Sequence, residues 1–133
     1  MSTQQKSNVI AIVDDDRSVQ DAVRDLLESD GHSVCCFDMA EDFLASGLHG
    51  KLACLVLDVR MPGMSGTELH RRLLDDGHEV PVIFMTAHVS DEKARARALA
   101  AGALAYLIKP FPDHELLDAV RRALTLKSSK TVE

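Results

Sequence analysis

The chain has 133 residues, a length typical of one domain, and its 46% apolar and 27% charged residues are typical of a folded globular protein. Its 15 Lys and Arg residues against 21 Asp and Glu residues give a net charge of −6, which argues against direct nucleic-acid binding. Its apolar runs reach only about five residues, whereas a membrane span needs roughly 20. The polar start lacks the apolar region of a signal peptide. Two of its three cysteines are adjacent, so we expect reduced thiols in a cytoplasmic protein.

The first half of the chain predicts two strand–helix units. Val9–Val13 is an apolar, β-branched run that three aspartates end, and residues 16–30 then have helical spacing, which Gly31 ends. Residues 33–37 predict a second strand, and Asp38 and Glu41 have the spacing of a capping box before a short helix. The apolar face of the long helix is expected to comprise Val19, Ala22, Val23, Leu26 and Leu27.

The second half repeats the alternation of strand and helix. Residues 53–57 predict a strand ending at Asp58, and Ser65 with Glu68 forms a second capping box that opens a helix closed by Gly77. Leu69, Leu73 and Leu74 should give this helix its apolar face. The remaining expected elements are a strand at 81–85, an alanine-rich helix at about 90–101, a strand at 105–108 and a last helix at 113–126.

Continuously apolar strands joined by helices predict an α/β protein with a parallel sheet covered on both faces. We expect five strands in the doubly wound order 2-1-3-4-5, the flavodoxin-like arrangement in three layers, because five units are too few for an eight-stranded barrel. In such a sheet, ligands bind beyond the carboxyl ends of the strands, where the winding direction reverses. Here that point lies between the first and third strands.

Polar residues follow the strands that meet at this point. Asp14, Asp15 and Asp16 end the first strand, and Asp58 ends the third. Two carboxylates about 4 Å apart repel by about 4 kcal/mol at an effective dielectric of 20, so such a cluster needs a cation. Carboxylates favour Mg²⁺ (or Mn²⁺), which often completes its coordination with phosphate oxygens.

Two further strands end in groups that suit phosphoryl transfer: Thr86 follows the fourth strand and Lys109 follows the fifth. One carboxylate could then act as a nucleophile and form an acyl phosphate. Taken singly, each residue has a simpler explanation: a helix N-cap, best fitted by Asp16, a loop hydroxyl, or a solvated lysine. Their convergence on one sheet edge favours the site.

The same segments resemble the receiver domain of bacterial two-component response regulators. The resemblance is carried by Ile12-Val-Asp-Asp-Asp16, by Leu57-Asp-Val-Arg-Met-Pro-Gly-Met-Ser-Gly66, by Phe84-Met-Thr-Ala-His88 and by Tyr106-Leu-Ile-Lys-Pro-Phe111. It covers residues 8–126, with 1–7 as a flexible N-terminus and 127–133 as a tail or the start of a linker. Receivers have the fold expected above.

The resemblance implies a role for each acidic residue at its position in this chain. Asp58 looks like the phosphoacceptor. Asp15 looks like a direct ligand of the metal, and Asp14 would act through metal-bound water. The backbone carbonyl of Arg60 looks like a further ligand. Asp58 would itself complete the metal site.

The resemblance also implies a switch. Thr86 would hydrogen-bond the phosphoryl oxygen, and Lys109 would pair with the phosphoryl group. Tyr106 occupies the position of the switch aromatic, outward when inactive and inward when active. Arg60 and His88 occupy positions that tune the lifetime of the phosphate. The protein would thus be a switch that catalyses only its own phosphorylation and dephosphorylation.

The implied partners are a sensor histidine kinase and an output domain or effector protein. The loop at 61–66 and the Lys-Pro-Phe ending are similar to receivers that precede a LuxR-type helix-turn-helix domain. We also expect weak or phosphorylation-dependent homodimerisation through the fourth helix, fifth strand and fifth helix.

Three other functions compete with the receiver. A phosphatase of the haloacid-dehalogenase type would use Asp14 and Asp16 as its acidic pair, but the chain has no room for a substrate cap. A pseudo-receiver that binds partners without phosphorylation would have a damaged acceptor set, and this set is complete. A flavin-binding protein would carry a Ser/Thr/Gly phosphate loop after the first strand, where this chain has acids.

Overall fold

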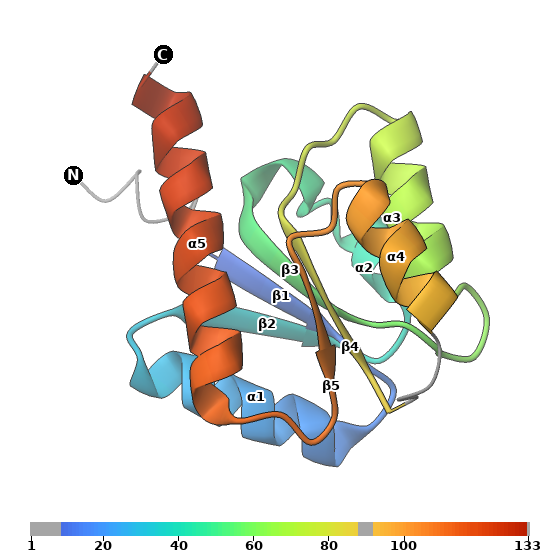
Figure 1. Cartoon of the computed structure of the whole chain (residues 1–133), viewed down its shortest axis with the longest axis horizontal. Coiled ribbons are helices and arrows are strands. Elements are labelled where there is room, and N and C mark those ends of the chain that lie inside the picture. Colours follow the sequence, from blue (N-terminus) through green and yellow to red (C-terminus); the bar gives the residue numbers. More distant parts are fainter. Residues whose placement is uncertain (1–8, 88–91, 133) are drawn as a thin grey trace.

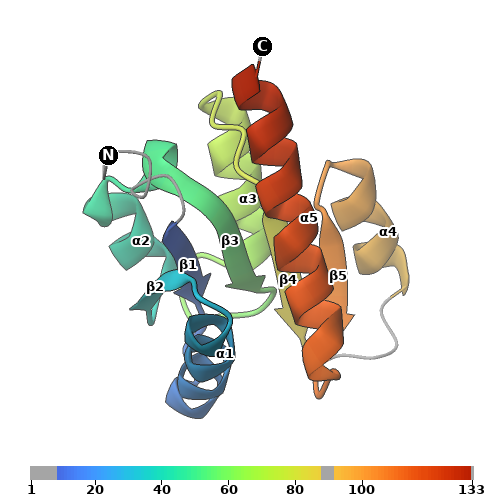
Figure 2. The same cartoon turned by 90° about the vertical axis from the view of Figure 1, so that its left-hand side faces the viewer.

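The computed structural model describes residues 9–87 and 92–132, which form one parallel sheet with helices on both faces (Figures 1 and 2). The strand order is β2-β1-β3-β4-β5, and every neighbouring pair is parallel. The predicted doubly wound order is therefore confirmed. The strands are β1 (Val9–Val13), β2 (Ser33–Phe37), β3 (Leu52–Asp58), β4 (Val82–Thr86) and β5 (Ala105–Ile108).

The helices divide between the two faces of the sheet. Residues of α1 and α5 pack in one apolar cluster with Ile10 and Ile12 of β1, and residues of α2, α3 and α4 pack in the other with Ala11 and Val13. This division follows from the alternation of side chains along a strand, which sends neighbours to opposite faces. The helices are α1 (Arg17–Ser29), α2 (Ala40–Ser46), α3 (Gly66–Asp75), α4 (Glu92–Ala100) and α5 (Asp113–Val132), with a short 3₁₀ turn at His49–Lys51.

The ends of two helices agree with the predicted capping signals. Asp16 is the N-cap of α1, and its side chain accepts hydrogen bonds from the backbone N–H groups of Ser18 and Val19. Ser65 and Glu68 form the reciprocal capping box of α3. Gly31 follows α1 with φ +90°, a left-handed conformation that glycine adopts without a steric penalty.

The predicted capping box at Asp38 and Glu41 is wrong. The N-cap of α2 is Met39, which makes no side-chain capping bond. Asp38 instead accepts hydrogen bonds from Arg17 and Gln20 of α1, and Glu41 accepts one from the backbone N–H of Met64. Both carboxylates are thus used by partners distant in sequence, which a local spacing rule does not detect.

Three further expectations need correction. Ala22 is exposed rather than part of the apolar face of α1, and Leu74, expected on the apolar face of α3, is 43% exposed. Helix α5 continues to Val132 rather than ending at Leu126, so residues 127–132 are helical. Its last turns project past the sheet in both views (Figures 1 and 2). The N-terminal residues 1–7 and the start of the predicted helix at 90–101 lie outside the described residues.

None of the helices in the described ranges is long and apolar enough to cross a membrane. Cys35, Cys36 and Cys54 are free thiols, and burial raises the pKa of Cys54 to about 12. Cys54 therefore packs as a small apolar side chain in the central strand.

Candidate functional site

Three carboxylates meet at the carboxyl ends of β1 and β3. Asp14 directly follows β1 and is fully buried, and Asp58 is the last residue of β3 and is 8% exposed. Asp15 follows Asp14 and is exposed. One carboxylate oxygen from each of these three residues lies within 4.8 Å of the other two. The predicted convergence of Asp14, Asp15 and Asp58 is thus present, because β1 and β3 are neighbours in the sheet.

Lys109 brings a cation to this acidic cluster from the end of β5. Its Nζ lies 3.0 Å from Asp14 Oδ2, to which it donates a hydrogen bond, and 3.7 Å from Asp58 Oδ1. Because its side chain is only 20% exposed, the ion pair is partly shielded from water. The backbone N–H of Lys109 also donates to the carbonyl of Thr86 at 2.7 Å, and the Lys109–Pro110 bond is cis.

Burial and the neighbouring carboxylate of Asp14 raise the pKa of Asp58 to about 6, against an ordinary value of 3.8. The ammonium of Lys109 and the backbone N–H of Arg60 act in the opposite direction. A single lysine therefore does not compensate the crowding of three carboxylates. A donor set made only of carboxylate oxygens suits a hard divalent cation such as Mg²⁺, which would supply the missing positive charge.

Asp16 does not belong to the cluster. Its carboxylate accepts bonds from Ser18 at the start of α1, and these bonds hold its pKa below the ordinary value. Its backbone N–H donates to Asp14 Oδ1 at 2.9 Å, which orients that buried carboxylate. The Asp14 side chain therefore lies in the acidic cluster, whereas the Asp16 side chain caps α1. The phosphatase alternative would need these two carboxylates to converge on one site.

Thr86 and Tyr106 lie on the two strands beyond β3. Thr86 ends β4, is 1% exposed, and follows Met85, which is the partner of Asp58 in the sheet register. Tyr106 of β5 is half-buried and contacts Phe84 with a ring centroid separation of 6.0 Å. Phe84 also contacts the buried ring of His70 on α3, so an aromatic row crosses this side of the sheet.

The loop after β3 is tied closely to Asp58. The backbone N–H of Gly66 donates to the carbonyl of Val59 at 2.9 Å. A Cβ atom on Gly66 would lie 2.0 Å from the carbonyl oxygen of Asp58, so only glycine fits at this point. Arg60 is exposed, and its backbone N–H hydrogen-bonds the Asp58 carboxylate. His88 lies outside the described residues.

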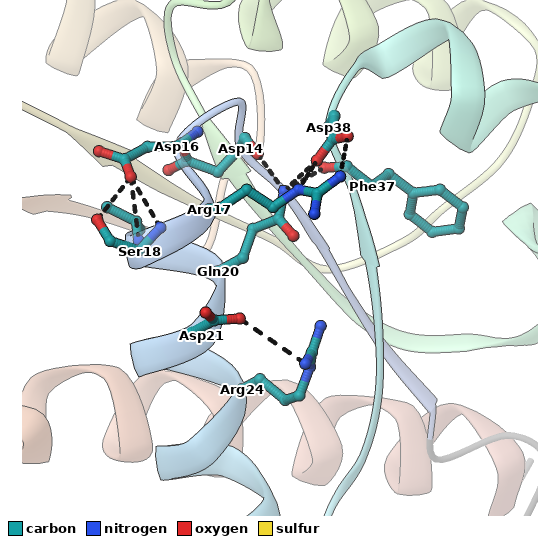
Figure 3. A network of polar contacts seen from close by, with 10 residues as sticks. Asp14, Asp16, Arg17, Ser18, Gln20, Asp21, Arg24, Phe37 and Asp38 are labelled. Carbon is teal, nitrogen blue, oxygen red and sulfur yellow. Dashed lines mark hydrogen bonds and ion pairs between the residues drawn. The ribbon is translucent and has the colours of Figure 1, made fainter.

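Sequence reasoning missed Gln20, which lies beside Asp14 and Asp38 (Figure 3). Its side chain is 3% exposed and its Nε2 atom donates to the backbone carbonyl of Asp14 at 2.6 Å and to Asp38 Oδ1 at 2.7 Å. The available signal was its register: it lies three and seven residues before Val23 and Leu27, the buried residues of α1. A polar residue in a buried position needs partners, and these were not visible locally.

The fold and the site define a phosphorylation-controlled signalling domain, and comparison with known families agrees. The model of the response regulator receiver domain matches residues 10–121. The chain therefore belongs to the response regulator receiver domain family, whose members act as switches in two-component signalling.

The chain is also similar to longer regulatory proteins. The chain is 43% identical over 121 residues to the response regulator protein TodT of Pseudomonas putida, an alignment that covers 91% of this chain and 53% of TodT. It is 39% identical to the transcriptional regulatory protein TdiR of Thauera aromatica, covering 90% of this chain and 52% of TdiR. The chain thus spans about half the length of these relatives.

Solved receiver structures have the same fold. The response regulator StyR superimposes with a TM-score of 0.85 at 42% identity, covering 92% of this chain and 62% of StyR. The N-terminal domain of FixJ superimposes with a TM-score of 0.79 at 36% identity, covering 88% and 93% of the two chains.

Proposed function

We propose that Asp58 is the residue that accepts a phosphoryl group, and that it does so from a phosphohistidine of a sensor kinase with Mg²⁺ (or Mn²⁺) bound. The observation that supports this most is the meeting of Asp14, Asp15 and Asp58 with Lys109 at one end of the sheet. Asp15 and Asp58 would hold the metal directly, with Asp14 acting through water and the carbonyl of Arg60 as a further ligand. The bound ion supplies the charge that neutralises the crowded carboxylates and the incoming phosphoryl oxygens.

The chain's own groups would carry out the transfer. An oxygen of the Asp58 carboxylate attacks phosphorus, the bond to the donor nitrogen breaks, and an acyl phosphate forms. Lys109, already 3.7 Å from Asp58 Oδ1, pairs with the phosphoryl oxygens. Hydrolysis of the acyl phosphate in the same site resets the domain, and Arg60 and His88 would tune its rate.

The switch would begin at Thr86. A phosphoryl group on Asp58 adds about −1.5 to −2 of charge and new acceptor oxygens, to which the Thr86 hydroxyl donates. Tyr106 would then move inward beside Phe84, which changes the surface around α4 and β5. That surface would control an output domain or effector, directly or through phosphorylation-dependent homodimerisation across α4, β5 and α5.

The length of the relatives is relevant to the output domain that this receiver would control. TodT and TdiR are about twice as long as this chain, so we propose an output domain of the LuxR-type helix-turn-helix class as the partner that this receiver controls. We place the protein in the cytoplasm, which suits its free thiols and a cytoplasmic kinase partner.

The experiment is phosphorylation with acetyl phosphate followed by intact mass spectrometry. The wild-type chain with Mg²⁺ should gain one phosphoryl group, and Asp58→Asn should gain none. Asp25→Asn, which changes an exposed aspartate in the middle of α1, is the matched control and should be labelled like the wild type. Labelling of Asp58→Asn at the wild-type level would refute the assignment.

A further inference from the structure

Gln20 is a buried glutamine that the phosphoryl chemistry above does not use. It continues the buried face of α1 that Val23 and Leu27 form, where an apolar side chain would pack without any need for partners. Burying an amide without hydrogen bonds costs free energy, so its presence requires a set of acceptors. The structure provides three, and all of them lie at the ends of β1 and β2.

The three acceptors converge on one nitrogen atom. Gln20 Nε2 lies 2.6 Å from the carbonyl oxygen of Asp14, 2.7 Å from Asp38 Oδ1 and 3.4 Å from the carbonyl oxygen of Phe37. The N–H of Asp14 in turn donates to the same Phe37 carbonyl at 3.1 Å. The register of β1 and β2 ends at Val13 and Phe37, so this bond lies at the end of their ladder.

The bond to the Asp14 carbonyl acts on the neighbouring acidic side chain. The carbonyl of Asp14 and the N–H of Asp15 belong to one planar peptide group. Fixing that carbonyl fixes the N–Cα bond of Asp15. The peptide after Asp15 is held by the hydrogen bond from the Asp16 N–H to Asp14 Oδ1 at 2.9 Å, so the two restraints together set the direction in which the Asp15 side chain leaves the backbone. Within the described residues, the exposed Asp15 carboxylate makes no hydrogen bond of its own, so its position depends on its backbone.

Arg17 holds the acceptor Asp38 in place. Arg17 donates to it through two nitrogen atoms, Nε to Oδ1 and Nη2 to Oδ2, each at 3.1 Å (Figure 3). A two-point contact of this kind fixes the plane of a carboxylate. Since the Arg17 side chain is 77% exposed, its ion pair with Asp38 contributes little to the stability of the fold, and its main effect is to orient the Asp38 carboxylate.

We propose that Gln20 is a positioning residue for the metal site: held by the Arg17–Asp38 pair, it fixes the Asp14–Asp15 peptide so that the carboxylates of Asp14 and Asp15 face a divalent ion together with Asp58. The inference rests on the proposed function, because it assumes that these carboxylates bind Mg²⁺. It goes beyond that function in assigning three residues outside the acidic cluster a role in metal affinity.

The test measures the Kd for Mg²⁺ of the full chain by isothermal titration calorimetry, without any phosphodonor. Gln20→Met keeps the size of the side chain and removes the donor, and its Kd should rise by about 10-fold to 100-fold, the usual range for groups that orient metal ligands. Val23→Ala is the matched control: it lowers stability from the next turn of the same buried face, and its Kd should stay at the wild-type value.

Kinetics separate positioning from general damage to the fold. With acetyl phosphate, Gln20→Met should require about 10-fold to 100-fold more Mg²⁺ for half-maximal phosphorylation, whereas its rate at saturating Mg²⁺ should approach the wild-type rate. An unchanged Mg²⁺ requirement, or a rate that stays low at saturation, would overturn the role of Gln20.

Arg17→Met tests the same chain of contacts at the surface and does not threaten folding. It removes a positive charge near the acidic cluster, so electrostatics alone predicts tighter Mg²⁺ binding. Positioning predicts the opposite, a weaker binding, and an unchanged or lower Kd would overturn the role of the Arg17–Asp38 pair. If the wild-type chain binds no Mg²⁺, the proposed function fails. If the wild type binds Mg²⁺ and Gln20→Met and Arg17→Met bind it with the same Kd, the proposed function stands and this inference fails.

Discussion

Replacing Asp58 by asparagine should stabilise the metal-free protein at neutral pH. The ionised carboxylate is held in a partly buried position beside Asp14, which raises its pKa from 3.8 to about 6. Each unit of pKa difference between the folded and unfolded chains corresponds to about 1.4 kcal/mol, so the ionised form destabilises the fold by roughly 3 kcal/mol at most. Asparagine keeps the shape and the acceptor for the Arg60 N–H but carries no charge.

The sign of the pH dependence follows from the direction of the shift. Between about pH 4 and pH 6 the folded protein binds a proton at Asp58 that the unfolded chain does not hold, so wild-type stability rises as pH falls through this window. Above about pH 6 the full penalty is present. The advantage of Asp58→Asn should therefore be about 2 to 3 kcal/mol at pH 8 and should vanish near pH 4.

The assay is urea unfolding of both proteins in EDTA at several pH values, with Asp25→Asn as a control that should follow the wild type. Mg²⁺ at 100 times its Kd should stabilise the wild type by about 2.7 kcal/mol and Asp58→Asn by much less, which removes or reverses the difference. A wild-type protein that is equally or more stable than Asp58→Asn at pH 8 in EDTA would refute the electrostatic reasoning.

Three other predictions follow from neighbouring contacts. Lys109→Met should destabilise the metal-free protein by roughly 2 kcal/mol, because the buried Asp14 carboxylate loses its ion-pair partner. Adding Asp14→Asn should recover the loss in urea unfolding, and no recovery would contradict the ion pair. Burial lowers the pKa of His70, because the folded chain disfavours the protonated ring. The buried neutral His70 therefore contributes its full stability above about pH 6.5, and that contribution falls as pH decreases below this value. His70→Leu, measured in the Asp58→Asn background to remove the opposing titration, should lose this acid sensitivity, and an unchanged pH profile would count against it. Gly66→Ala should lower the urea midpoint by an amount equal to about 2 kcal/mol or more, because its Cβ would meet the Asp58 carbonyl at 2.0 Å; a neutral result would exclude that close contact.

The strands and the acidic cluster could be predicted from the sequence because their signals are local. An apolar run such as Val9–Val13 predicts a buried strand by itself, and the acid that follows it is placed by the strand end. Once the order of parallel strands is inferred, the carboxyl ends of β1 and β3 must be neighbours. The proximity of Asp14 and Asp58 can therefore be predicted from the strand order alone, without any side-chain contact being known.

The second layer of the site could not be predicted in this way. Asp38 has the spacing of a cap for α2, but its carboxylate accepts hydrogen bonds from Arg17 and Gln20 of α1 instead. The pairing of β1 with β2 brings the start of α1 close to Asp38. Gln20 has the same difficulty: its buried position follows from helical spacing, whereas its acceptors lie on two other segments of the chain, at the ends of β1 and β2. Long-range hydrogen bonds of this kind become visible only once the elements are packed.

The bond between Lys109 and Asp14 joins residues 95 positions apart, across the whole winding of the sheet. A chain emerging from the ribosome makes its acids first and gains the neutralising ammonium only when β5, at the sheet edge, has been synthesised and has docked. Until then the carboxylates have no lysine partner from that strand. The last strand to be made therefore completes the ion pair on which the buried Asp14 carboxylate depends.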